Sequence, residues 1–143
     1  MRVYRNVKLR QLGIKFCAPR PGDAGYDLFS IENYLVGARK RVLVDSGLHI
    51  EIPSGYVGLV KDRSSVAAAG LHTLAGVIDS AYRGELKILM VNLADEDIQI
   101  HAGQNIAQLL VVPVGNAPVE FVDSLEDLSK TERGSGGFGS TGE

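Results

Sequence analysis

An acid and an aromatic residue stand close together in the middle of the chain, and their setting suggests chemistry. Asp79 ends an apolar segment that begins at Ala75, Tyr82 follows three residues later, and Gly84 closes the polar turn. A carboxylate held where a buried strand meets its turn is partly withdrawn from water, which raises its proton affinity and suits a general base. An ordinary turn-forming aspartate fits the same pattern, so Asp79 is a candidate base.

A second apolar run, residues 86–93, follows this turn. Two β-type segments around a polar turn that contains glycine are typical of a hairpin, so we expect residues 75–93 to form one. The run is apolar on both faces, whereas a small antiparallel fold normally exposes one face of a strand to water. We therefore expect a subunit interface of a homo-oligomer, or else another layer of strands, to cover the second face.

Two further segments contain groups suited to binding anions. Residues 61–65 read Lys-Asp-Arg-Ser-Ser and lead into an alanine-rich stretch, which predicts a short helix over residues 64–70, capped by serine and ended by Gly70. Helix N-terminal amides, hydroxyls and a guanidinium can hold an anion, or can form an ordinary cap beside a surface ion pair. Gln108 lies in an apolar run, so its amide must be hydrogen-bonded, either to backbone or to a water or phosphate.

The C-terminal stretch, residues 133–142, is rich in glycine and serine. Its glycines match the dinucleotide pattern G-x-G-x-x-G, but we reject that match because the pattern needs a preceding strand and a following helix. Glycine amides can still approach phosphates closely, Arg133 adds a fork of charged donors, and Phe138 can stack on a base. Most such stretches are merely flexible, but this arginine and phenylalanine favour a binding role.

Composition limits the classes of function. The chain has 143 residues, 45% of them hydrophobic, and a net charge of −2. This length suits one domain, and the lack of a basic excess argues against general nucleic-acid binding. The lone Cys17, the absence of a long apolar run and an N-terminus without an apolar core predict a soluble intracellular protein rather than a membrane or secreted one. The three histidines lack ligand spacing, so we expect no metal site formed by protein ligands alone.

Short alternating segments separated by turns account for most of the remaining chain. Such a pattern with almost no helix predicts an all-β sandwich or barrel. We expect residues 1–129 to form the domain and residues 130–143 a flexible C-terminal arm. The basic residues that precede Asp23 are interpreted mainly as a solvated strand face, with a polyanion site as the alternative. The segments expected to contain strands are residues 3–16, 24–28, 41–52, 56–60 and 106–114.

Five segments, taken in order, resemble the motifs of the trimeric dUTPase family. They are Pro-Gly-Asp-Ala-Gly-Tyr-Asp-Leu at residues 21–28, Gly-Leu-Val-Lys-Asp-Arg-Ser-Ser at 58–65, and residues 76–85, 103–109 and 133–142. The third and fifth are the most specific. The resemblance implies a jelly-roll-like β fold, a homotrimer with shared active sites, and magnesium-dependent hydrolysis of dUTP to dUMP and pyrophosphate. That activity limits uracil incorporation into DNA and supplies dUMP for dTMP synthesis.

The same resemblance implies residue roles. Asp79 would activate the water that attacks the α-phosphate, Gln108 would help to place that water, and Asp27 would act on Mg²⁺ through bound waters. Tyr82 would pack against the deoxyribose and leave no room for a 2′-hydroxyl. The residues expected to bind phosphate are Arg63, Ser64, Ser65, Arg133, Ser140 and Thr141. The residues expected to contact base or sugar are Thr73, Val77, Ile78, Tyr82, Lys87 and Phe138.

Three positions depart from the family pattern, and two other functions stay open. Ala81 stands where an acid is frequent, Ser65 where glycine is usual, and Asp62 where proline is common, which puts a negative charge beside Arg63. The alternatives are a dCTP deaminase, or bifunctional dCTP deaminase/dUTPase, of related fold and a non-catalytic nucleotide-binding protein. The glycine-rich stretch with its phenylalanine favours the hydrolase over the deaminase, and the presence of Asp79 argues against a non-catalytic protein.

Overall fold

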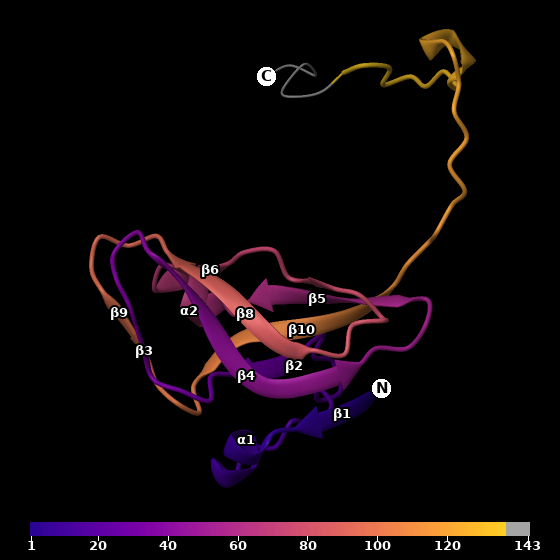
Figure 1. Cartoon of the computed structure of the whole chain (residues 1–143). Helices are drawn as coiled ribbons and strands as arrows, with labels where there is room; N and C mark the ends of the chain where they lie inside the picture. Colours follow the sequence, from indigo (N-terminus) through magenta and orange to yellow (C-terminus); the bar gives the residue numbers. More distant parts are fainter. Residues whose placement is uncertain (137–143) are drawn as a thin grey trace.

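The computed structural model describes residues 1–136 and confirms an all-β fold. Its strands form two four-stranded antiparallel sheets, ordered β1-β4-β8-β6 and β2-β10-β5-β7, and a two-stranded ribbon of β3 and β9 (Figure 1). The elements are β1 (Arg2–Arg5), α1 (Val7–Gln11), β2 (Tyr26–Phe29), β3 (Tyr34–Val36), β4 (Arg41–Glu51), β5 (Tyr56–Asp62), α2 (Ser64–Ala68), β6 (Leu71–Thr73), β7 (Val77–Ile78), β8 (Glu85–Asn92), β9 (Ile98–Ile100), β10 (Asn105–Pro113) and the 3-10 turn η1 (Leu125–Asp127).

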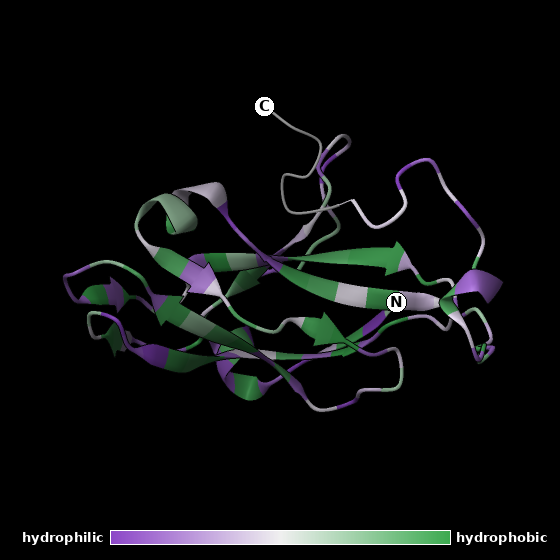
Figure 2. Ribbon diagram, turned by 90° about the horizontal axis from the view of Figure 1, so that it is seen from above, coloured by the Kyte–Doolittle hydropathy of each residue, from purple (hydrophilic) through white to green (hydrophobic). Residues whose placement is uncertain are grey.

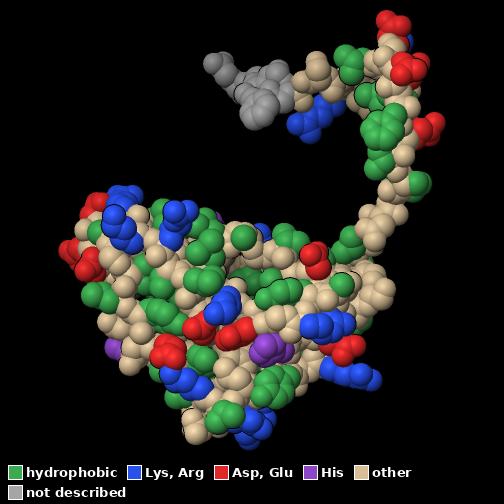
Figure 3. Space-filling model, in the orientation of Figure 1, with side chains coloured by type: hydrophobic (Ala, Val, Ile, Leu, Met, Phe, Trp, Pro, Cys, Tyr) green, Lys and Arg blue, Asp and Glu red, His purple; other side chains and the backbone are tan. Residues whose placement is uncertain are grey.

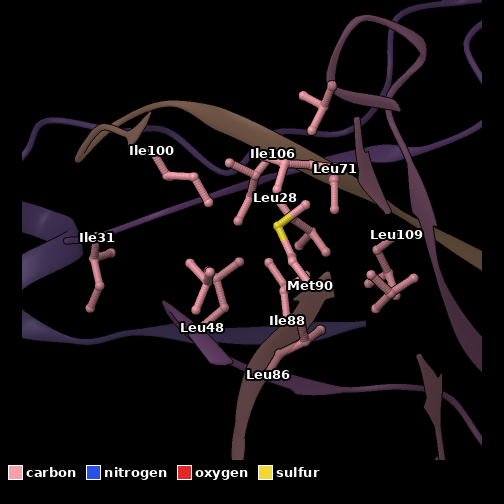
Figure 4. Close-up of a cluster of buried hydrophobic side chains, with 14 of the residues drawn as sticks. Leu28, Ile31, Leu48, Leu71, Leu86, Ile88, Met90, Ile100, Ile106 and Leu109 are labelled. Carbon is pink, nitrogen blue, oxygen red and sulfur yellow. The ribbon is translucent and has the colours of Figure 1, made fainter. Parts of the chain in front are cut away.

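Side chains from both large sheets fill one shared core, as expected for a jelly-roll-like sandwich. Hydrophobic residues concentrate on the strands and hydrophilic ones on the loops (Figure 2). On β8, Leu86, Ile88 and Met90 alternate with more exposed residues and are at most 1% exposed. Leu28 and Leu109 of the other sheet belong to the same buried cluster (Figure 4). Burial of this alternating face is what holds the two sheets together.

The N-terminal segment differs from the single strand expected over residues 3–16. Strand β1 ends at Arg5, and the side chain of Asn6 accepts a hydrogen bond from the Leu9 amide at 2.9 Å, which begins α1. An asparagine cap satisfies an amide that has no partner within the helix, and so it stops the strand. The helix places Leu9, which is fully buried, in the core.

The predicted hairpin over residues 75–93 is wrong, because its two halves lie in different sheets. Val77 and Ile78 pair with β5, whereas β8 pairs with β4 and β6. The chain changes sheets after β6 through two consecutive residues with positive φ, Ala75 at 57° and Gly76 at 90°. This left-handed turn directs the backbone away from β8 and costs on the order of 1 kcal/mol at the alanine.

The outward face of β4 and β8 remains partly apolar. Leu43 lies opposite Leu89 in the antiparallel register, and the Leu43 side chain is 50% exposed. Leu89 and Val91 are only half-buried. Within residues 1–136 no further strand layer covers this face, which excludes that alternative for the single chain.

After Pro113 the chain leaves the sandwich and runs outward (Figure 1). Large apolar side chains on this segment stand clear of the body (Figure 3), with Val119 79%, Phe121 94% and Leu125 86% exposed. Nowhere in residues 1–136 does a helix have the length and apolar character that crossing a membrane requires.

Candidate active site

Arg63 lies between β5 and helix α2, as the N-cap residue of the helix. Its backbone is extended, and within residues 1–136 no side chain caps the helix, so the prediction of a serine cap is wrong. Ser64 and Ser65 are the first helical residues, and both are exposed. The helix ends as predicted, with Gly70 at a φ of 99°. The two hydroxyls are therefore not used by the cap and remain available to a ligand.

A polar pocket of about 680 Å³ lies beside Arg63 and brings together several predicted residues. Arg63, Ser64, Gln108 and Asp27 all line it. Ser65 instead lines an adjoining hollow that also contacts Arg63. These residues come from β2, α2 and β10 and from the junction of β5 with α2, and the pairing of β10 with both β2 and β5 assembles them.

Sequence reasoning missed two cations of this pocket, Lys15 and Arg20. Both belong to the run of basic residues before Asp23, which was interpreted mainly as a solvated strand face. They lie instead in the irregular segment between α1 and β2. The run itself was the available signal, since a cluster of cations in an irregular segment can turn toward an anion site.

Asp27 forms an ion pair with Arg63, and both residues line this pocket. Its second carboxylate oxygen accepts a hydrogen bond from the side-chain amide of Asn105 at 3.2 Å. The guanidinium is therefore held in place before any ligand arrives. Such a charged, hydrogen-bonded pair fixes the orientation of an arginine fork toward a phosphate.

Gln108 is half-buried, and its amide contacts the backbone. Its Nε2 donates to the Asp62 carbonyl at 2.8 Å, which is one of the hydrogen bonds expected for an amide in an apolar run. On its other side it lies against Gly25, where an added Cβ would come within 2.8 Å of Oε1. Gln108 thus has a structural hydrogen bond and also faces the pocket.

The carboxylate of Asp62 does not lie beside Arg63 as a competing charge. Its Oδ1 accepts hydrogen bonds from the amide and the hydroxyl of Thr73, both at 2.7 Å, and its Oδ2 lies 2.5 Å from Nδ1 of His72. Burial acts to raise the pKa of Asp62, but the bonds from Thr73 and His72 outweigh burial and hold it below its ordinary value. The Thr73 amide, expected near uracil, is engaged by this carboxylate.

A second pocket, of about 340 Å³, contains the predicted base and most of the predicted base- and sugar-binding residues. Asp79 is exposed in the single chain, so the partial burial expected for it is absent there. Val77 is 65% and Tyr82 44% exposed. The residues that line this pocket are Leu43, Val77, Ile78, Asp79, Tyr82, Glu85 and Lys87.

Tyr82 is held in this pocket by its own turn. Its amide donates to the Asp79 carbonyl at 3.1 Å, and its hydroxyl donates to the Glu85 carbonyl at 2.9 Å. The ring lies against Gly84, where any Cβ would overlap the phenol. The aromatic face is therefore positioned relative to Asp79 by three contacts within one turn.

Lys87 forms a cross-strand ion pair at the edge of the same pocket. Its Nζ lies 2.8 Å from Oδ1 of Asp45, and the Tyr34 hydroxyl donates to Asp45 Oδ2 at 3.1 Å. The bond from Lys87 is the main reason that the pKa of Asp45 lies below its ordinary value, and Asp45 in turn raises the pKa of Lys87. Burial raises the pKa of Tyr34.

The predicted site is thus divided within one chain. Among residues 1–136, none lines both pockets, so Asp79 and Tyr82 lie apart from Arg63 and Gln108. Arg133 is exposed, and its Nε donates to the Gly136 carbonyl at 2.9 Å. The predictions for Phe138, Ser140 and Thr141 lie outside the described residues.

Comparison with known proteins identifies the class and then the family. The chain is 45% identical to the deoxyuridine 5'-triphosphate nucleotidohydrolase of Clostridium kluyveri over 124 residues, 85% of each protein. It is 43% identical to a probable enzyme of that name from Schizosaccharomyces pombe over 138 residues, 94% of this chain and 96% of the relative. The class is therefore that of a nucleotide-hydrolysing enzyme. A family model described as dUTPase matches residues 13–142, and the chain belongs to the dUTPase family.

Solved structures agree with this family. The dUTPase of Staphylococcus bacteriophage 80alpha with dUpNHpp superimposes with a TM-score of 0.87 at 28% identity, over 99% of this chain and 98% of that one. A dUTPase from phage phi11 of S. aureus, described with a structural Mg(II) ion, gives a TM-score of 0.76 at 26% identity, over 87% and 97%. The predicted resemblance is confirmed, and these relatives favour the hydrolase over the deaminase.

Proposed function

We propose that this protein hydrolyses dUTP to dUMP and pyrophosphate by attack of a water molecule on the α-phosphate. The observation that carries the proposal is that Asp79, Val77, Ile78, Tyr82 and Lys87 line one pocket, as expected for a base beside a nucleoside site. The substrate analogue in the bacteriophage 80alpha enzyme supports the choice of nucleotide. By this activity the protein would limit uracil incorporation into DNA and supply dUMP.

Asp79 acts in this reaction as the general base. Asp79 is exposed in the single chain, and partial withdrawal from water strengthens a carboxylate as a base, so the active form needs a second surface beside Asp79. The phosphate groups of the substrate also need the cations of the other pocket, because phosphoryl chemistry depends on positioning and charge neutralisation. Both requirements are met if a second copy of the chain places its Arg63 pocket against the Asp79 pocket.

The active assembly on this proposal is a homotrimer with sites shared between subunits. The partly apolar outer face of β4 and β8, with Leu43 opposite Leu89, offers a surface for such contacts. The exposed apolar side chains of Val119, Phe121 and Leu125 offer a second one. Burial of these groups between subunits would contribute about 25 cal/mol per Å² of apolar area.

The residues present fit an indirect role for Mg²⁺. Within residues 1–136 no cluster of three or more ligating side chains forms a cage for a metal. Mg²⁺ is commonly held by one or two carboxylates, waters and the substrate phosphates, and Asp27 supplies one carboxylate in the cationic pocket. When bound, the ion would neutralise charge on the triphosphate. Asp27 would contact it through water, while Arg63, Ser64 and Ser65 hold phosphate oxygens.

Pyrophosphate release tests this proposal directly. We expect turnover with dUTP and at most weak turnover with UTP, dCTP and dTTP, together with dUMP as the second product. Ammonia released from dCTP would support the deaminase instead. Asp79→Asn should keep binding of dUpNHpp and lose turnover by about 10²- to 10⁴-fold, the usual contribution of a general base. Near-normal turnover in that variant would remove Asp79 from the role of base.

A further inference from the structure

Asp62 connects three elements around the cationic pocket. It is the last residue of β5, its side chain is bonded to Thr73 and His72 on β6, and its carbonyl accepts from Gln108 on β10. Only 22% of its side chain is exposed. Arg63, the next residue, lines the pocket. A movement of the Asp62 backbone would therefore reach both pocket residues.

The contact with Asp62 determines which end of the Gln108 amide faces the pocket. A backbone carbonyl only accepts hydrogen bonds, so the group 2.8 Å from the Asp62 carbonyl must be the NH₂ of Gln108. The oxygen Oε1 is then directed toward Gly25, which also lines the pocket. Gln108 lines the same pocket, so its acceptor lies at the pocket wall beside Gly25, where a bound water would donate a hydrogen to it.

We propose that Asp62 is a positioning residue, whose anchored carboxylate fixes its own carbonyl and thereby holds Gln108 with its acceptor toward the attacking water. The proposal rests on the function proposed above and concerns the same site. The two bonds from Thr73 to Oδ1 hold the end of β5 against β6. Without them only the pairing of β5 with β10 holds the Asp62 backbone, and the carbonyl that orients the Gln108 amide shifts.

The hydrogen-bond acceptor, rather than the negative charge, carries this role. Both bonds from Thr73 go to Oδ1, which the amide oxygen of an asparagine can replace. The contact with His72 goes to Oδ2, and the His72 ring is more than half exposed. Screening by solvent weakens that contact. Asparagine should thus retain the function, and leucine, of similar size but without an acceptor, should not.

Steady-state kinetics of the assembled full-length protein on dUTP test this inference through Asp62→Asn and Asp62→Leu. Misplacement of a group that orients the water costs on the order of tenfold to a hundredfold in kcat. We expect that loss in Asp62→Leu, a KM within about threefold of wild type, and near-normal kcat in Asp62→Asn. Asp95→Leu is the matched control, because Asp95 is also ion-paired, with Arg39, but lines none of the three pockets described above.

Separate outcomes distinguish a positioning role from a purely structural one. A purely structural role lowers the thermal midpoint of Asp62→Leu and leaves kcat per folded trimer at the wild-type value, which would overturn the proposal. Equal losses in Asp62→Asn and Asp62→Leu would overturn it too.

A second variant covers the case in which Asp62→Leu does not assemble. Thr73→Val removes one of the two bonds to Asp62 Oδ1 and should lower kcat by about threefold. An unchanged kcat in Thr73→Val would contradict the proposal. A wild-type protein without dUTP turnover would refute the proposed function instead.

Discussion

The phenol ring of Tyr82 lies against the backbone of Gly84, and the absence of a side chain at residue 84 is what gives the ring its place. An ideal Cβ on Gly84 would overlap the hydroxyl and ring carbons of Tyr82. The hydroxyl is bonded at the same time to the Glu85 carbonyl at 2.9 Å. The wall of the Asp79 pocket therefore depends on a glycine that is not among the residues lining that pocket.

Gly84→Ala should lower the preference for dUTP over UTP. The added methyl group displaces the ring of Tyr82, and space opens where a 2′-hydroxyl would lie. A change of one methyl group in a close-fitting pocket changes discrimination by about tenfold or more. The measurement is the ratio of kcat/KM for the two nucleotides, with Tyr82→Ala as the reference for complete loss of the ring.

Gly115→Ala provides the matched control for this experiment. A Cβ at Gly115 meets nothing within 4 Å, and the residue lies beyond β10, outside both main pockets. Its kinetics should match the wild type. If Gly84→Ala and Tyr82→Ala discriminate as well as the wild-type protein, Tyr82 does not select the sugar.

Mixing two inactive variants should restore activity if sites are shared between subunits. Asp79→Asn lacks the base of one pocket, and Arg63→Ala lacks a cation of the other, so each homotrimer should be nearly inactive. After joint refolding of equal amounts, the two kinds of subunit assort at random. About a quarter of the shared sites then combine an intact Asp79 pocket from one variant with an intact Arg63 pocket from the other. We expect the rate of pyrophosphate release to return to about a quarter of the wild-type rate. Mixtures no more active than the separate variants would show that each site uses one subunit.

Deletion of residues 133–143 should leave the assembly intact and remove most of the activity. Those of them that the structure describes, residues 133–136, lie outside the hydrophobic core, and among the residues described the Arg133 side chain hydrogen-bonds only to the Gly136 carbonyl. Their expected role is to close over the phosphates and base, which excludes water from the reaction. Sedimentation and pyrophosphate release report the two effects separately. A truncated protein with full activity would contradict the closing role.

Asp45 and Lys87 should make stability depend on pH in a defined direction. The folded-state pKa of Asp45 lies below its ordinary value, chiefly through the bond from Lys87. The ionised Asp45 therefore stabilises the fold above the ordinary aspartate pKa of about 4, and this stabilisation is lost as pH falls through the folded-state pKa. The pKa of Lys87 is raised, so the charged Lys87 stabilises the fold below the ordinary lysine pKa of about 10. This stabilisation is lost as pH rises through the folded-state pKa.

A double-mutant cycle measures this pair. Asp45→Asn, Lys87→Met and the double variant are unfolded in urea at one protein concentration, at neutral pH and near pH 2.5. The coupling free energy should be favourable at neutral pH and smaller in acid, because the carboxylate becomes protonated as pH falls through the folded-state pKa of Asp45. A coupling that does not change with pH would show that the contact is not ionic.

Local features of the fold are visible in the sequence. The alternation over residues 41–52 predicted β4 closely, because a strand with one buried face has a period of two, and the apolar run over residues 106–114 predicted β10. Gly70 marked the end of α2, since few other residues adopt its positive φ easily. The residue types around Asp79 made it a candidate base, the resemblance of this segment to a dUTPase motif implied a nucleotide site, and Asp79 and Tyr82 do line one pocket.

The tertiary structure alone decided which of these local pieces meet. Residues 77–78 and β8 look like the two halves of a hairpin, but the positive φ values of Ala75 and Gly76 send them to different sheets. The acid beside Arg63 in the sequence turns to Thr73, while Asp27, far away in the chain, pairs with Arg63. Side-chain periodicity is set by neighbours along the backbone, whereas the choice of partner depends on contacts between distant residues that leave no local pattern.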